Sequence, residues 1–162
     1  MSLSDIDALS KILSPLLIIA GWYLVVTNQA RQSRRKLIRD EVDKLSTLVI
    51  ELTDSAILFH TEEASDSNRR KILGKLTFLS RRIGLVPKLA KLNWTTWDAV
   101  RATQLSVPSK DIIAFRQAIT LNHFDDTTDA RIGMDSALVA GIEIARDALL
   151  ASLDSQLIAA LD

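Results

Sequence analysis

The chain has 162 residues, of which 48% are hydrophobic and 25% are charged, a balance typical of a folded protein rather than a disordered one. It contains no cysteine, which excludes disulfide frameworks, thiolate metal sites and cysteine nucleophiles. Its 20 basic and 20 acidic residues give a formal net charge of zero, but these charges are segregated along the chain.

An uncharged apolar stretch from Ile12 to Val26 predicts a transmembrane helix over residues 12–27. Trp22 and Tyr23 lie toward its C-terminal end, where an aromatic belt would meet the membrane surface. One alternative is a cleaved signal peptide, which requires a basic N-terminal region where this chain has an acidic one. The other is a buried core helix, because the stretch is short for a membrane crossing.

The charges on either side of this stretch predict its orientation. Asp5 and Asp7 precede it, and a basic cluster follows it, made of Arg31, Arg34, Arg35 and Lys36. The positive-inside rule places residues 1–11 outside as a short extracytoplasmic tail. Residues 28–36 then form a basic juxtamembrane linker, and residues 37–162 form a cytoplasmic domain. We therefore expect a single-pass membrane protein, which the resemblance given below assigns to a bacterial inner membrane.

Beyond the linker, apolar residues recur at alternating steps of four and three, which predicts a coiled-coil-like helix from about Ser33 to His60. This seam has two interpretations, packing inside one subunit's bundle or a parallel contact between subunits around a membrane axis. Only the second predicts a homo-oligomer, for which a tetramer is one option. The seam consists of Ile38, Val42, Leu45, Val49, Leu52, Ala56 and Phe59.

The next elements are also predicted to be helical. A polar break over residues 62–68 precedes a helix that ends near Gly84. A short helix follows over residues 87–92, and a capping box at Thr95 and Asp98 opens another that reaches about Leu105. The apolar positions of the helix that ends near Gly84 are Ile72, Leu76, Leu79 and Ile83.

The last third of the chain predicts two more helices. Ser109 can cap a helix that contains Ile112, Phe115 and Ile119, and the final helix begins near residues 127–129. No segment shows the alternation of a strand. The expected fold class is therefore all-α, with an N-terminal transmembrane helix followed by a cytoplasmic helical bundle. The final helix is expected to bury Met134, Leu138, Ile142, Ala145, Leu149, Ser152 and Leu157.

The middle of the chain is strongly basic, since residues 67–101 hold nine basic residues and one acidic residue between acidic flanks. The simplest interpretation is that these charges pair with acids on neighbouring helices. A second is an anion site with arginine forks and stacking tryptophans, and a third is contact with anionic lipid. The candidate ligand-binding residues are Arg69, Arg70, Arg81, Arg82, Lys88, Lys91, Trp94 and Trp97.

Catalytic motifs are absent from the sequence, which has no Walker loop, GxGxxG, GxSxG or HExxH pattern. The acidic loop from His123 to Asp129 could hold a divalent cation, but capping of the last helix explains it more simply. We therefore expect a protein that is not an enzyme and that uses no cofactor or metal. The remaining alternative is an enzyme that acts on lipid or nucleotide through this loop.

The span at Ile12–Val26, the flank Arg31–Lys36 and the helical domain with Arg69-Arg70-Lys71 together resemble the small membrane effectors of type III CRISPR defence. The resemblance is one of architecture and covers the whole chain. It implies an oligomeric effector that binds cyclic oligoadenylate and damages the inner membrane in antiviral defence. The Rossmann-like pattern of the usual sensor domain is missing, so the ligand site would be of another type.

Two functions follow from this layout. In the first, the partners are inner-membrane lipid, further copies of the chain and a cyclic oligonucleotide, but not duplex nucleic acid. In the second, the chain is a non-catalytic membrane adaptor or scaffold that recruits a protein partner through its helical domain.

Overall fold

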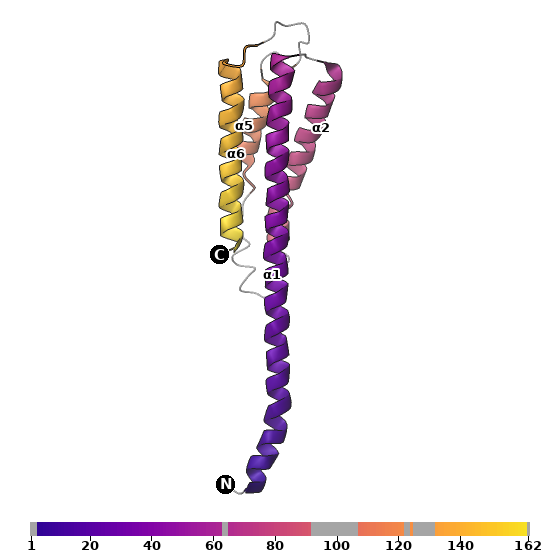
Figure 1. The fold of residues 1–162 in the computed structure, drawn as a ribbon, viewed down its shortest axis with the longest axis vertical. Helices are drawn as coiled ribbons and strands as arrows, with labels where there is room; N and C mark the ends of the chain where they lie inside the picture. Colours follow the sequence, from indigo (N-terminus) through magenta and orange to yellow (C-terminus); the bar gives the residue numbers. More distant parts are fainter. Residues whose placement is uncertain (1–2, 63–64, 92–106, 122–123, 125–131, 162) are drawn as a thin grey trace. The chain divides into compact units, whose positions relative to one another are not determined.

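The computed structural model describes residues 3–62, 65–91, 107–121, 124 and 132–161 (Figure 1). Within these ranges the chain forms helices and connecting turns without any strand, so the predicted all-α class is confirmed. The chain divides into two compact units, Met1–Leu37 and Ile38–Asp162.

The first unit is formed by the N-terminal part of helix α1, which spans Leu3–Thr61 and includes Pro15 in its interior. The Thr27 hydroxyl donates hydrogen bonds to the carbonyls of Tyr23 and Leu24, at 2.9 and 3.0 Å, so the helix itself satisfies this polar group. Among the described residues, no helix combines the length and the apolar character that a membrane crossing requires. The transmembrane span at residues 12–27 stays a prediction.

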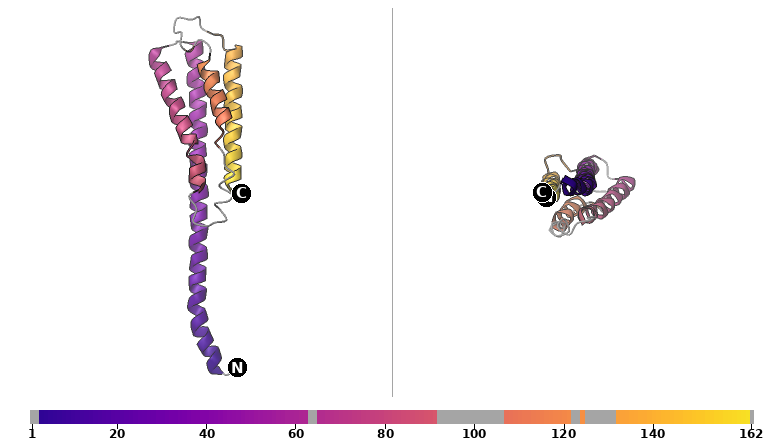
Figure 2. Two further views of the ribbon diagram at one scale, coloured as in Figure 1. Left: turned by 180° about the vertical axis from the view of Figure 1, so that it is seen from behind. Right: turned by 90° about the horizontal axis from the view of Figure 1, so that it is seen from below.

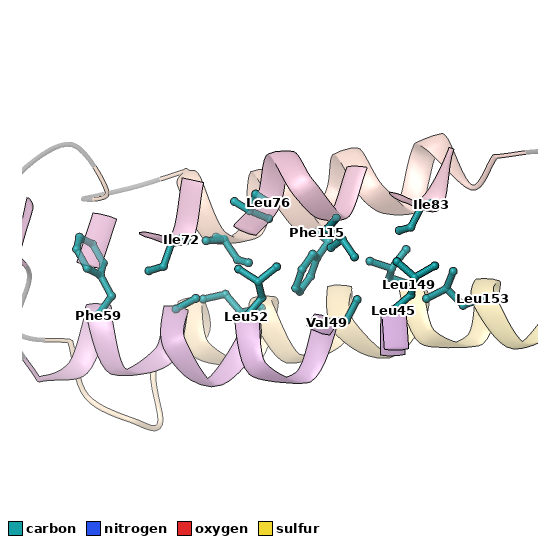
Figure 3. Close-up of a cluster of buried hydrophobic side chains, with 14 of the residues drawn as sticks. Leu45, Val49, Leu52, Phe59, Ile72, Leu76, Ile83, Phe115, Leu149 and Leu153 are labelled. Atoms are coloured by element: carbon teal, nitrogen blue, oxygen red, sulfur yellow. The ribbon is translucent and has the colours of Figure 1, made fainter. Parts of the chain in front are cut away.

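The second unit is a helical bundle with one hydrophobic core. It contains the part of α1 from Ile38 onward, together with α2 (Asp66–Ile83), α5 (Ser109–Thr120) and α6 (Ala137–Leu161). Within this unit, α2 and α6 lie on opposite sides of α1, and α5 packs beside α6 (Figures 1 and 2). Side chains from these helices meet in a single cluster between them (Figure 3).

The predicted seam of α1 faces this core. Each of its seven side chains is 3% exposed or less. They pack against residues such as Ile72 of α2, Phe115 of α5 and Leu149 of α6 (Figure 3). The interpretation as packing inside one subunit is therefore confirmed. The alternative, a parallel contact between subunits through this seam, is wrong because the seam already fills the core of its own chain.

Helix α2 matches its predicted apolar positions, and all four are buried. Its N-cap is Ser65, whose hydroxyl accepts a hydrogen bond from the Asn68 amide at 3.2 Å. The helix therefore begins inside the polar break that was predicted over residues 62–68. Gly84 is the C-cap as predicted, but its φ of −64° is right-handed, so the left-handed freedom of glycine is not used there.

The next two elements show one agreement and one correction. Helix α3 (Val86–Lys91) corresponds to the short helix predicted at residues 87–92, whereas the helix predicted from Thr95 to Leu105 lies outside the described residues. Ser109 is the first residue of α5 and not its cap. Pro108 takes the N-cap position, where its carbonyl accepts the Ile112 amide at 3.1 Å, and its side chain has no polar atom that could cap the helix.

Helix α6 begins at Ala137, later than predicted, because residues 132–136 form a turn before it. The Ser136 hydroxyl caps the helix by accepting a hydrogen bond from the Val139 amide at 3.3 Å. Met134 precedes the helix and is 64% exposed, so its predicted burial is wrong. Residues 127–129 lie outside the described residues. Ile142 and Leu149 are buried as predicted, and Leu153 joins them.

Candidate functional site

The arginines predicted to bind an anion lie in two groups on α2. Arg69 and Arg70 are in its first turn and a half, and Arg81 and Arg82 are in its last turn. Arg81 lies eleven positions after Arg70, which corresponds to about 17 Å along the helix axis. The described part of the structure therefore does not bring these four arginines to one point.

Two of these arginines are engaged by acids of the same chain. The Arg82 Nη1 atom lies 3.0 Å from Glu41 Oε1 of α1, and its guanidinium group lies 5.4 Å from the centre of the Phe78 ring. Arg69 pairs with Asp66 of its own helix at 3.6 Å. Glu41 is only 8% exposed, so the contact with Arg82 compensates a carboxylate that the bundle has largely removed from water.

A further ion pair joins the same two helices, between Lys75 Nζ of α2 and Glu51 Oε2 of α1, at 3.3 Å. Basic side chains of α2 therefore meet acidic side chains of α1 at two levels of the bundle. This arrangement agrees with the simplest interpretation of the segregated charges, pairing between helices inside the molecule.

The remaining candidate residues lie beyond α2. Lys88 is exposed on α3, and Lys91 is the last residue of that helix. Trp94 and Trp97 lie outside the described residues, as do the acids and the histidine of the loop at 123–129. The predicted cluster of Lys88, Lys91 and Trp94 therefore stays a prediction.

A cleft of about 320 Å³ lies between α1 and α2, near the end of α1. Two lysines and an asparagine from α2 line it, together with a serine of α1, a glutamate that follows the end of α1, and three apolar side chains. These groups could bind a small anion by hydrogen bonds and charge, but they include no nucleophile paired with a base. The lining residues are Ser55, Leu58, Phe59, Glu62, Asn68, Lys71, Ile72 and Lys75.

A second cleft of about 440 Å³ lies between the same helices and contains the Glu41–Arg82 pair. Because Arg82 is already paired with Glu41, and Asp43 and Glu51 also line this cleft, it does not favour an anion. Of the two clefts, the one that contains Lys71 and Lys75 is the better candidate anion site because only one acid lines it, although Lys75 also pairs with Glu51.

His60 is buried where three segments meet. Its Nε2 atom lies 3.1 Å from the Ile119 carbonyl of α5, and its own carbonyl accepts the Ile132 amide at 3.1 Å. Its ring also lies near those of Phe59 and Phe124, with centroids 5.3 and 6.2 Å away. His60 therefore links the end of α1 to a carbonyl of α5. Among the described residues, no group of acids and histidines could hold a metal ion.

Helix α6 provides an acidic surface. Asp147 Oδ1 accepts a hydrogen bond from Arg146 Nε at 2.8 Å. This bond raises the pKa of Arg146. The negative charges of Asp147, Glu143 and Asp54 also raise it. Arg146 is the one basic residue of α6. The Ser152 hydroxyl of α6 donates a hydrogen bond to Asp111 of α5, so this bond joins the two helices.

The first unit carries the largest apolar surface of the described chain. Its apolar side chains between residues 13 and 26 are 40–69% exposed, and they occupy consecutive positions rather than one face of the helix. Exposed Arg31, Arg35 and Lys36 follow this surface. The surface consists of Leu13, Leu16, Leu17, Ile18, Ile19, Trp22, Tyr23, Leu24, Val25 and Val26.

Comparison of the chain with protein-family profiles, with curated proteins and with solved structures finds no match. The functional assignment therefore depends on the surfaces described above.

Proposed function

We propose that the protein is a single-span membrane protein that holds its helical bundle at the cytoplasmic face as a non-catalytic adaptor. The observation that carries this proposal is the apolar surface of α1 between residues 13 and 26. A helix that is apolar on all sides is stable in a protein core or in a membrane, but not in water.

The free energy gained by covering the apolar side chains of this segment supports a lipid environment for it. Covering ten large apolar side chains that are about half exposed is worth on the order of 10 kcal/mol. That is comparable with the whole folding free energy of a small domain. The segment from Ala8 to Thr27 would be about 30 Å long as a helix, which matches the hydrocarbon thickness of a bilayer.

The flanking charges support the orientation. Two acids precede the apolar segment, and four cations follow it within ten residues of Val26. Because cations remain on the cytoplasmic side of a short span, this charge pattern supports a cytoplasmic bundle.

The polar groups of the bundle support an adaptor over an enzyme. His60 contacts the Ile119 carbonyl, Glu41 pairs with Arg82, and Asp111 accepts a hydrogen bond from Ser152. Each of these contacts joins two helices, so the side chains that most resemble catalytic groups hold the bundle together. A bundle of this kind presents a stable surface for a partner.

Alkaline extraction of membranes from cells that express the full chain tests this proposal. We expect the wild type to stay in the membrane pellet, and the Leu17→Lys/Ile18→Asp variant to move to the supernatant, because charges at the centre of a span cost about 3 kcal/mol each. The control is Ile50→Lys/Ile113→Lys, which changes exposed side chains of the bundle. A wild-type chain that is recovered in the supernatant as a compact monomer would refute the proposal.

A second candidate is the anion-sensing effector, in which a cyclic oligoadenylate binds the bundle. The cleft that contains Lys71 and Lys75 and the exposed Arg70 favour it. Calorimetry of the full chain in detergent, with cyclic oligoadenylates of several ring sizes, is the test. Heat of binding that is lost in Arg70→Ala/Lys71→Ala would support the effector function. The absence of heat with every ring size would contradict it and favour the adaptor function.

A further inference from the structure

The outer face of α6 is an unpartnered apolar surface. Whereas Ile142, Leu149 and Leu153 on one side of the helix are fully buried, Ile144 and Ile158 on the other side are 71% and 61% exposed. No part of the described chain covers these two large apolar side chains, so this outer face is a candidate interaction surface. It consists of the exposed residues Ala137, Ala140, Ile144, Ala148, Ala151, Ser155 and Ile158, spaced three or four apart.

The outer face of α2 also combines apolar and charged groups. Phe78 is 52% exposed and Leu73 is 37% exposed, and arginines lie on the same side of the helix. Gly74 lies there too, and a Cβ atom added to it would meet no atom within 4 Å. No contact within the described chain therefore requires a glycine at this position, although glycine weakens a helix. This face consists of the exposed residues Arg70, Leu73, Gly74, Thr77, Phe78 and Arg81.

The two faces carry opposite charge. Helix α2 has six basic residues and one acid, whereas α6 has three acids and one basic residue. The exposed acids of α6 next to its apolar stripe are Glu143, Asp147 and Asp154. Apolar stripes flanked by opposite charges are complementary surfaces, and the same charges oppose contact between two α2 faces or two α6 faces.

The positions and lengths of the two helices suit contact between copies. They lie on opposite sides of α1 within the bundle, so one molecule cannot join its own two faces (Figures 1 and 2). Helix α2 has 18 residues and α6 has 25, so they are about 27 and 37 Å long, and α2 can lie along α6 over its whole length.

We propose that the outer face of α2 in one copy docks on the outer face of α6 in a second copy of this chain. Such a contact is head-to-tail, so each copy offers one free face of each kind, and repetition gives a closed ring or an open array. This goes beyond the proposed function, because the contact needs only the bundle and no membrane anchor. It also differs from the seam predicted from the heptads, which is buried in the monomer.

Two charge-reversal variants of the full chain in neutral detergent test the pairing of the faces. Arg70→Glu/Arg81→Glu makes both faces acidic, and Glu143→Lys/Asp154→Lys makes both faces basic. Light scattering after size exclusion should show association of the wild type, and association at least about tenfold weaker for each variant alone. An equal mixture of the two variants should associate again, because each then meets a face of opposite charge.

Several results would overturn the proposal. A wild type that is monomeric over the whole accessible concentration range excludes the contact. If each variant alone lost association and the mixture did not restore it, the faces of α2 and α6 would not pair with each other and the proposal would be wrong. Both variants should stay in the membrane pellet on alkaline extraction, as expected of the wild type. A failure of the membrane anchor would therefore be detected separately from a failure of this contact.

Cross-linking tests the head-to-tail geometry, because the chain has no cysteine of its own. With a short bismaleimide, a mixture of Thr77→Cys and Ala148→Cys chains should give a single dimeric product, and either variant alone should give none. A chain that carries both cysteines should give a ladder of larger products. Dimers from Thr77→Cys alone, or from Ala148→Cys alone, would show a symmetric contact and contradict the proposal.

Discussion

Helix α1 carries two apolar surfaces, which differ in how their residues are arranged around the helix and in how exposed they are. From Ile38 onward, seven apolar residues form one stripe whose side chains are at most 3% exposed, whereas Ile50 and Leu58 lie off this stripe and are about half exposed. Between residues 13 and 26, large apolar residues occupy every side of the helix and are 40–69% exposed. A stripe with heptad spacing is covered by the chain's own helices, whereas an all-round surface requires a different environment.

The largest expected effect is the difference between one substitution, leucine to alanine, made in each of the two parts of α1. Leu52 is fully buried in the core, so Leu52→Ala should lower the free energy of unfolding of the bundle by about 2–5 kcal/mol. Leu17→Ala, at a position that is 67% exposed in the first unit, should leave this free energy unchanged. Denaturant unfolding of the full chain in detergent, followed by circular dichroism, measures both. Equal losses for the two variants would show that the two surfaces are not distinct.

A smaller effect should separate the two ion pairs that join α1 to α2. Arg82→Met leaves the nearly buried Glu41 carboxylate without this partner and should cost about 1–3 kcal/mol of unfolding free energy. Lys75→Met removes a pair whose side chains are 41% and 57% exposed, and should cost less than about 0.5 kcal/mol. The same unfolding experiment provides the comparison. A larger loss for Lys75→Met would contradict the burial of Glu41 as the deciding factor.

The smallest effect is a gain. Gly74→Ala should stabilise the monomeric bundle by about 0.5–1 kcal/mol, because alanine favours the helix and the added methyl group meets no neighbouring atom. Gly21→Ala, in the first unit, should leave bundle unfolding unchanged. Thermal unfolding at low protein concentration measures both variants. A loss of stability in Gly74→Ala would show that a contact of this monomer occupies the space beside Gly74.

Periodicity made the helices of the bundle predictable. The heptad stripe of α1 and the spacing of Ile72, Leu76, Leu79 and Ile83 depend only on which residues are apolar, and burial follows such spacing closely. The segregated charges likewise predicted pairing between helices. Which acid meets which cation was not predictable, because the pairing of Glu41 with Arg82 depends on how α1 and α2 are aligned.

The errors occurred where a contact distant in sequence decides the local structure. His60 stands at a helix end, and only the fold shows that its ring meets the Ile119 carbonyl 59 residues away. Several cap candidates precede α6, and the sequence does not rank them, so its start at Ala137 was missed. The candidate anion site stays a prediction, and its members Arg70 and Arg81 lie in separate turns of α2.

Cysteine labelling in spheroplasts tests the central claim, that one apolar segment separates an outer N-terminus from a cytoplasmic bundle. A membrane-impermeant maleimide should label Ser4→Cys in intact spheroplasts, and it should label Thr77→Cys only after lysis. The cysteine-free wild type gives the background. Labelling of both positions, or of neither, in intact spheroplasts would contradict the proposed membrane crossing.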